Sequence, residues 1–135
     1  STGAVGNSLT DNTWFDDAGN VIKIAPAGSK LFTKFTYDSL GRRTKQYLGY
    51  DLDETSYAEA GTVTGDTLLE QNETSYDAAS NAIQSTMRQR YHNASDSQTG
   101  ELQNPSTTPK ARVTYVAQYP DALGRPAATA NYGTN

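Results

Sequence analysis

The feature of this 135-residue sequence that most restricts its fold is a short motif that occurs four times. The motif consists of an aromatic residue, an aspartate, two variable residues, a glycine and a polar residue. Its aspartates are Asp16, Asp38, Asp77 and Asp121, so successive copies are 22, 39 and 44 residues apart. Recurrence on this scale indicates a structure built from repeated supersecondary units.

The spacing within the motif predicts a tight hairpin turn. An aspartate at the first turn position accepts a hydrogen bond from the backbone N–H two residues further on. A glycine three residues after it adopts the left-handed conformation that closes a three-residue hairpin with a bulge. Each copy therefore predicts strand, turn and strand. The predicted turn residues are Phe15, Asp16, Gly19, Tyr37, Asp38, Gly41, Arg42, Tyr76, Asp77, Ser80, Tyr119, Asp121, Gly124 and Arg125.

Two copies depart from the pattern. Ser80 stands where the third copy should have its glycine, and a left-handed serine costs about 1 kcal/mol. We therefore expect the third turn to be the weakest. Pro120 is inserted between Tyr119 and Asp121 in the fourth copy. Proline removes a ladder donor, which predicts a bulge or an edge position there.

The segments beside the turns read as strands. Apolar residues alternate with polar ones over 31–37 and 113–119, and weaker strand patterns cover 44–48 and 67–75. Ile22 and Ile24 flank Lys23 in a further short run of the same kind, and no segment carries a convincing helical stripe. We predict an all-β fold of repeated twisted antiparallel hairpins.

The predicted organisation is a single repeat domain over residues 1–135. Two insertions near 51–66 and 92–111 are rich in Gly, Ser, Thr, Asn and Asp, and we expect them to form long loops or small hairpins. The sequence lacks an initiator methionine, and neither end resembles the cap of a repeat array. We therefore expect an excerpt of a longer chain.

Composition excludes several classes of protein. Leu, Ile, Val and Phe are 20 of 135 residues, or 15%, which is a low fraction for a globular protein. The nine tyrosines oppose a disordered chain, because they can bury area in a thin, polar β-structure. The chain has no cysteine, so disulfides and cysteine zinc sites are impossible. A net charge of −4 argues against nucleic-acid binding, and no apolar run approaches the length of a membrane helix.

Residues that could perform chemistry are few. His92 is the only histidine, and we interpret it as a solvated loop residue rather than a catalytic one. Asp51, Asp53 and Glu54 form an acidic cluster that could bind calcium, although a solvated charged loop is favoured. We expect no enzymatic activity and no cofactor.

Three aromatic residues favour an alternative reading. Trp14, Tyr50 and Tyr57 lie outside the aromatic positions of the motif, and exposed planar rings commonly bind sugars. The alternative function is a stand-alone β-module that binds cell-surface glycans.

The motif resembles the YD repeat of the rearrangement-hotspot (Rhs) family, which includes bacterial polymorphic toxins, insecticidal toxin-complex shells and teneurins. Residues 37–42 match it fully, residues 121–125 match after the inserted proline, and the resemblance covers roughly 14–132. It implies a long spiralling sheet that wraps into a hollow shell around cargo. The family's self-cleaving segment contains Asp-Pro, which is absent here.

The resemblance implies a structural function, as a wall segment of a larger secreted or surface-exported protein. Its expected partners are flanking repeats and enclosed cargo. Terminal strands of an excerpt expose unpaired backbone groups, so edge-to-edge self-association is also expected.

Overall fold

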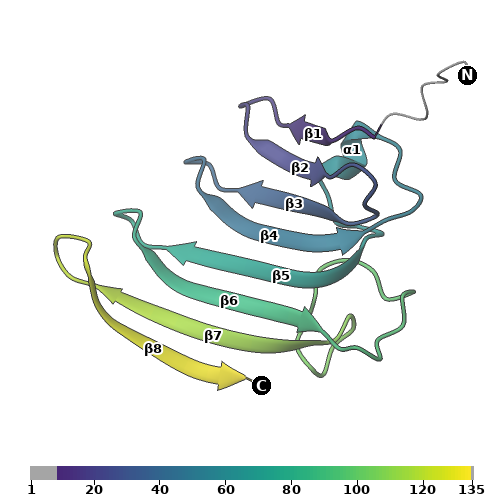
Figure 1. The fold of residues 1–135 in the computed structure, drawn as a ribbon. Coiled ribbons are helices and arrows are strands. Elements are labelled where there is room, and N and C mark those ends of the chain that lie inside the picture. Colours follow the sequence, from purple (N-terminus) through teal and green to yellow (C-terminus); the bar gives the residue numbers. More distant parts are fainter. Residues whose placement is uncertain (1–8, 135) are drawn as a thin grey trace, which may run out of the picture.

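The computed structural model describes residues 9–134 and shows one open sheet of eight antiparallel strands in chain order (Figure 1). The all-β prediction is confirmed. The strands are β1 (Asn12–Phe15), β2 (Val21–Ala25), β3 (Phe32–Tyr37), β4 (Arg43–Tyr50), β5 (Thr67–Tyr76), β6 (Ala82–Arg90), β7 (Ala111–Pro120) and β8 (Pro126–Thr134). Both weaker strand patterns fall within real strands, β4 and β5.

The connections differ between the two ends of the strands. The four motif turns join β1 to β2, β3 to β4, β5 to β6 and β7 to β8, and all lie along one side of the sheet (Figure 1). The opposite side carries the longer connections, residues 51–66 and 91–110. We call these the first and second insertions.

The first insertion contains a short helix that we did not predict, α1 (Tyr57–Ala60). Ser56 caps it: the Glu59 backbone N–H donates to Ser56 Oγ at 3.3 Å, and the Ser56 N–H donates to the Glu59 carboxylate at 2.7 Å. This reciprocal pair is a capping box. The Ser-x-x-Glu spacing was the available signal, and the polar composition of the segment obscured it.

Each motif hairpin has a register shift next to its aspartate. Phe15, Tyr37 and Tyr76 lie at the shift in the first three hairpins, and Pro120 lies there in the fourth. The proline is therefore not an extra residue between the aromatic position and the aspartate. It occupies the aromatic position itself, and Tyr119 lies one residue earlier, on the opposite face of the strand.

A single line of paired residues crosses seven strands, and we call it the central row. Its members are Trp14, Lys23, Lys34, Tyr47, Gln71, Arg88 and Val113. Directly opposed residues share one face of a sheet. Lys23, Lys34, Tyr47, Gln71 and Val113 are all buried. The covered face of this sheet is therefore largely polar.

The buried residues of β2 are not those that the sequence pattern favoured. Ile24 is 36% exposed, whereas Lys23 beside it is only 7% exposed. The Lys23 ammonium lies 4.8 Å from the centre of the Trp14 ring and 5.0 Å from that of Phe32. A lysine can be buried in this way when its stem packs on apolar surface and its charge faces aromatic rings.

The apolar core is small and connects the sheet to both insertions. Its buried members are Phe32, Tyr47, Leu68, Leu102 and Ala111, and Ala25 and Val63 pack against them. Leu102 belongs to the second insertion and Val63 to the first. The insertions therefore complete a core that the strands alone do not form.

Candidate functional site

The turn of the second hairpin is held by one carboxylate. Asp38 Oδ1 accepts hydrogen bonds from the backbone N–H groups of Leu40 at 2.9 Å and Arg42 at 3.0 Å. Asp38 Oδ2 accepts a third from Arg42 Nε at 2.7 Å. The Gly41 N–H donates to the Asp38 carbonyl at 3.0 Å, which closes the turn.

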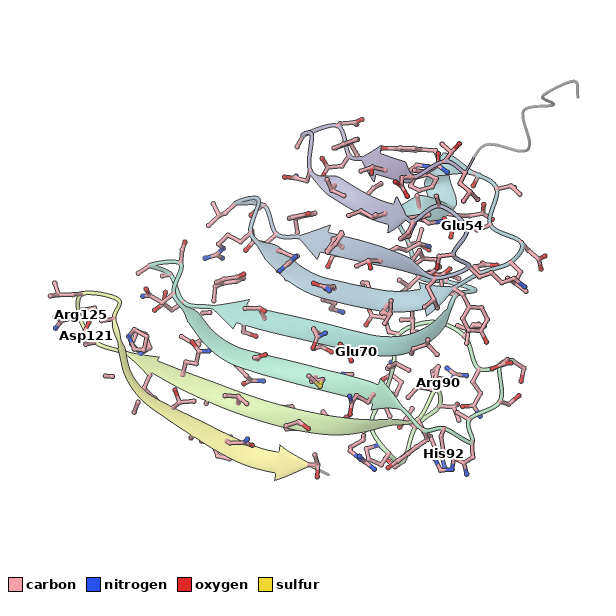
Figure 2. The ribbon with its side chains drawn as sticks, in the orientation of Figure 1. Glu54, Glu70, Arg90, His92, Asp121 and Arg125 are labelled. Atoms are coloured by element: carbon pink, nitrogen blue, oxygen red, sulfur yellow. The ribbon has the colours of Figure 1, made fainter. Side chains whose placement is uncertain are left out.

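The other three turns repeat this geometry. Asp16, Asp77 and Asp121 each accept from the N–H groups two and four residues further on and from one side chain, at 2.8–3.0 Å. The side-chain donor is the polar residue after the motif's glycine position, which Ser80 fills in the third turn. Figure 2 shows Asp121 and Arg125 together at the tip of the last hairpin. The motif's polar last position was the signal for this third bond, which we did not predict.

The backbone is left-handed at the same place in every turn. Gly19, Gly41 and Gly124 have φ of 85°, 73° and 75°, and Ser80 has φ of 68°. Ser80 is the one residue other than glycine with positive φ among residues 9–134. It is held in that conformation although its side chain disfavours it.

Substitutions at these positions separate strain from hydrogen bonding. We expect Gly41→Ala to lower the free energy of unfolding by about 1 kcal/mol, because a Cβ there meets no atom within 4 Å and only the backbone is strained. Ser80→Gly relieves strain but removes an acceptor for Arg42 Nη1, at 3.0 Å. Ser80→Gly should therefore be more stable than Ser80→Ala by about 1 kcal/mol in urea unfolding. Equal stabilities of these two variants would contradict the left-handed turn.

Tyrosine hydroxyls link one hairpin to the next. Tyr37 donates to the carbonyl of Val21 at 2.8 Å, and Tyr76 donates to the carbonyl of Arg43 at 2.9 Å. Val21 and Arg43 hold the same position, five residues after their motif aspartates. The bond therefore repeats from the first hairpin to the second and from the second to the third.

An arginine strengthens the second of these links. The Arg42 guanidinium lies 4.7 Å from the centre of the Tyr76 ring. Its Nη1 donates to the carbonyl of Asp77 at 3.2 Å and to Ser80 Oγ at 3.0 Å. Arg42 thus stabilises its own turn by donating to Asp38, and the following turn by donating to Asp77 and Ser80. We refer to the tyrosine bond and the arginine contact together as the hairpin link.

The first and fourth copies lack the tyrosine bond. Phe15 has no hydroxyl and is 50% exposed. Tyr119, shifted to the other face, shares a hydrogen bond of 3.0 Å with the hydroxyl of Tyr132 instead.

The turn aspartates make stability depend on pH. Burial raises the pKa of Asp38, but its hydrogen bonds from the Arg42 backbone and guanidinium outweigh this and hold the pKa below 3.8. A lowered pKa in the folded state means that the unfolded state binds more protons as the pH falls. The stabilisation from Asp38 is therefore present at neutral pH and is lost as the pH falls below 3.8.

We expect the difference in urea midpoint between wild type and Asp38→Asn to shrink as the pH is lowered through this range. Asparagine keeps one turn acceptor but has no titrating carboxylate, so it serves as the matched reference. A difference that is constant with pH would contradict the ionised turn.

Acidic residues of the first insertion bind the lysines of the central row. Lys23 Nζ lies 2.8 Å from Glu54 Oε1, and Lys34 Nζ lies 3.0 Å from Glu54 Oε2 and 2.7 Å from Asp66 Oδ2. The Glu54 side chain is 4% exposed and reaches the sheet from the insertion (Figure 2). These buried pairs fasten the insertion to β2 and β3.

The acidic cluster in the structure differs by one residue from the one that we considered for calcium: Asp66 takes the place of Asp53. Carboxylate oxygens of Asp51, Glu54 and Asp66 lie within 4.8 Å of one another. Asp53 does not join this group, and its backbone N–H donates to Asp51 Oδ1 at 2.8 Å. Lysine ammoniums neutralise Glu54 and Asp66. Asp66 was missed from the sequence because it lies 12 residues from Glu54.

The second insertion docks on the next part of the central row. Glu101 Oε1 accepts from Tyr47 Oη and from Lys45 Nζ, both at 2.7 Å. The Leu102 N–H donates to Gln71 Oε1 at 2.8 Å. Burial, together with Glu101, raises the pKa of the Tyr47 hydroxyl well above its usual value of 10.0.

The remaining candidate residues lie apart from these contacts. Trp14 and Tyr50 are half-buried, and the Trp14 ring faces Lys23. Tyr57 is 55% exposed, and its hydroxyl donates to the carbonyl of Phe15. His92 is exposed in the second insertion, at the far end of the strands from the motif turns (Figure 2).

Hairpins with equivalent turns, joined edge to edge in one sheet, define this fold as a β-hairpin repeat. Residues 15–49, which hold the first two hairpins, match the family model described as RHS Repeat. This match supports the resemblance to the YD motif that the sequence indicated. The curated proteins contain no match to the chain. Among the described residues, no helix is long and apolar enough to cross a membrane.

Proposed function

We propose that the chain is a wall segment of a larger secreted or surface-exported Rhs-like protein, with no chemistry of its own. The observation that supports this most strongly is the hairpin link. The same tyrosine-to-carbonyl bond joins the second hairpin to the first and the third hairpin to the second, so a hairpin of this kind carries a group that receives the next one. A structure of this kind extends by adding hairpins at its edge and can enclose cargo.

The C-terminal edge has the groups for a further link. Pro126 occupies the position of Val21 and Arg43, five residues after the motif aspartate, and has a carbonyl that can accept a tyrosine hydroxyl. Arg125 corresponds to Arg42, and its side chain is 72% exposed. In the parent protein, a following hairpin would place its tyrosine on Pro126 and its ring against Arg125.

Adding one hairpin tests this proposal. A second copy of residues 32–50, joined after Asn135 through a flexible linker, should pair with β8 and raise the free energy of unfolding. The matched control carries Tyr37→Phe in the added copy only, which removes one hydroxyl. That control should lose about 0.5–1.5 kcal/mol of the gain, the usual net value of one hydrogen bond.

The unextended chain supplies the second measurement. We expect its mass in solution to rise with concentration as β8 edges pair, and the added hairpin should suppress this rise. An added hairpin that leaves stability unchanged, on a chain that is monomeric at every concentration, would overturn the wall proposal.

Glycan binding is the alternative function. A cavity of about 320 Å³ lies between the insertions and the sheet, and Tyr47, Thr62 and Glu101 line it with polar groups. Tyr57 adds an exposed ring at the first insertion. Binding to a panel of immobilised cell-surface glycans that is lost in Tyr57→Ala, with Tyr132→Ala as the exposed-ring control, would favour this reading over the wall.

A further inference from the structure

Three side chains of the buried cluster form an arrangement with its own chemistry. Lys34 Nζ lies 2.7 Å from Asp66 Oδ2 and 3.0 Å from Glu54 Oε2. The side chains of Lys34 and Asp66 are each 2% exposed, and that of Glu54 is 4% exposed. An amine and two carboxyl groups are thus held in contact, away from solvent.

The surroundings weaken the charged form of Asp66. The Phe32 ring lies 4.6 Å from Lys34 Nζ, and Phe32 itself is only 3% exposed. Burial raises the pKa of Asp66 to about 6, against the pull of the Lys34 ammonium. Burial of the Asp66 carboxylate lowers the cost of moving a proton from Lys34 to Asp66, compared with the same groups in water.

Backbone carbonyls fix the position of the nitrogen. Lys34 Nζ donates to the carbonyl of Glu59 at 2.9 Å and to that of Thr62 at 2.7 Å. These bonds hold the ammonium as the resting form, so the amine becomes free only after a proton moves to Asp66. They also prevent the nitrogen from turning away, and such positioning avoids the loss of entropy that an intermolecular reaction would incur.

We propose that Lys34 and Asp66 join through an amide bond between Nζ and Cγ, with Glu54 as the proton-transfer residue. The ammonium first gives one proton to the Asp66 carboxylate. The free amine then attacks Cγ and forms the N–C bond. Glu54 takes a second proton from the nitrogen and returns it to the departing hydroxyl, which leaves as water.

The reaction is a condensation, which needs no oxidant and no co-reactant. One ammonium and one carboxylate become one neutral amide and one water molecule, and Glu54 ends as the carboxylate that it was. Burial favours the product, because two charges that are costly to desolvate disappear.

Glu54 is suited to this role by its own contacts. Its two oxygens are buried, and neither accepts a hydrogen bond from any group among residues 9–134. They are held by ion pairs, between Oε1 and the Lys23 ammonium at 2.8 Å and between Oε2 and the Lys34 ammonium at 3.0 Å. Glu54 therefore retains acceptor capacity directed at the reacting nitrogen.

The bond would have a mechanical consequence for the fold. It would tie the middle of β3 to the residue immediately before β5, across 32 positions of the chain. The first insertion would then be covalently closed onto the sheet, which restricts the unfolded chain as a disulfide does. A chain without cysteine would gain a cross-link that reducing agents do not break.

The mass of the intact wild-type chain, measured after folding and then denaturation, tests the proposal. We expect a mass lower than that of the sequence by one water molecule, and protease digestion should yield one branched peptide that joins the segments around Lys34 and Asp66. Lys34→Arg keeps the charge but cannot form this amide, so it should show the full mass. Glu54→Gln should form the bond at least ten-fold more slowly.

Lys45→Arg is the matched control, because Lys45 also contacts a carboxylate at 2.7 Å but is 32% exposed. It should lose water as the wild type does. Full mass in wild-type protein after prolonged incubation in the folded state would overturn the proposal, and so would water loss without the branched peptide. Unchanged kinetics in Glu54→Gln would overturn the role of Glu54. None of these results depends on the hairpin edge.

Discussion

Lys34→Ala should lower the free energy of unfolding by about 3–5 kcal/mol, the usual cost of removing one partner from a buried ion pair. Lys34 contacts Glu54 at 3.0 Å and Asp66 at 2.7 Å, and all three side chains are at most 4% exposed. Without the lysine, two carboxylates face each other in a site from which water is excluded. Urea unfolding followed by tryptophan fluorescence measures the loss, because Trp14 lies in the same row.

The control for this prediction is Lys45→Ala. Lys45 and Glu101 are 2.7 Å apart, but their side chains are 32% and 41% exposed, so solvent screens the pair. We expect a loss of about 0–1 kcal/mol, as for other exposed pairs. Equal losses in the two variants would contradict a special role for the buried cluster. Lys34→Arg, which keeps the charge, separates loss of the ion pairs from loss of any cross-link.

Leu102→Ala should lower the free energy of unfolding by about 2–5 kcal/mol, the range for leucine deleted from a core. Leu102 is 1% exposed and packs with Phe32, Tyr47, Leu68 and Ala111. It is the member of this cluster that the second insertion contributes. Its loss leaves a cavity beneath the insertion, and the strands on either side are too constrained to fill it.

Leu123→Ala provides the comparison within the same protein. Leu123 lies in the fourth turn and is 77% exposed, so its truncation should change stability by less than about 0.5 kcal/mol. If Leu102→Ala were equally mild, the second insertion would not be part of the core. Hydrogen exchange of the amides in residues 91–110 would show the same dependence, with protection lost in Leu102→Ala.

The positions of the strands were largely predictable from the motif. The turn chemistry is local, since each aspartate binds groups two to four residues away, and such bonds form whatever the rest of the chain does. The exception is the fourth copy. There we placed Tyr119 at the aromatic position of the motif, whereas in the structure Pro120 occupies that position. Residue type was a weaker guide than distance from the aspartate.

The contacts that hold the insertions could not be predicted in the same way. Lys34 and Asp66 are 32 residues apart, and Lys45 and Glu101 are 56 residues apart. Nothing in the local pattern of either residue indicates its partner. Alternation in β2 favoured the isoleucines as the buried face, since apolar character normally decides which face is covered.

The sequence by itself determined the hairpins, because an aspartate and a left-handed residue three positions later define a turn through bonds inside the turn. Only the tertiary structure decided which face of the sheet is buried and what occupies it. Burying Lys34 is unfavourable unless carboxylates and carbonyls from the first insertion reach it, and Gln71 needs the Leu102 N–H in the same way. Those partners arrive only when the strands are paired in register. The polar central row is therefore a property of the assembled sheet and its insertions together.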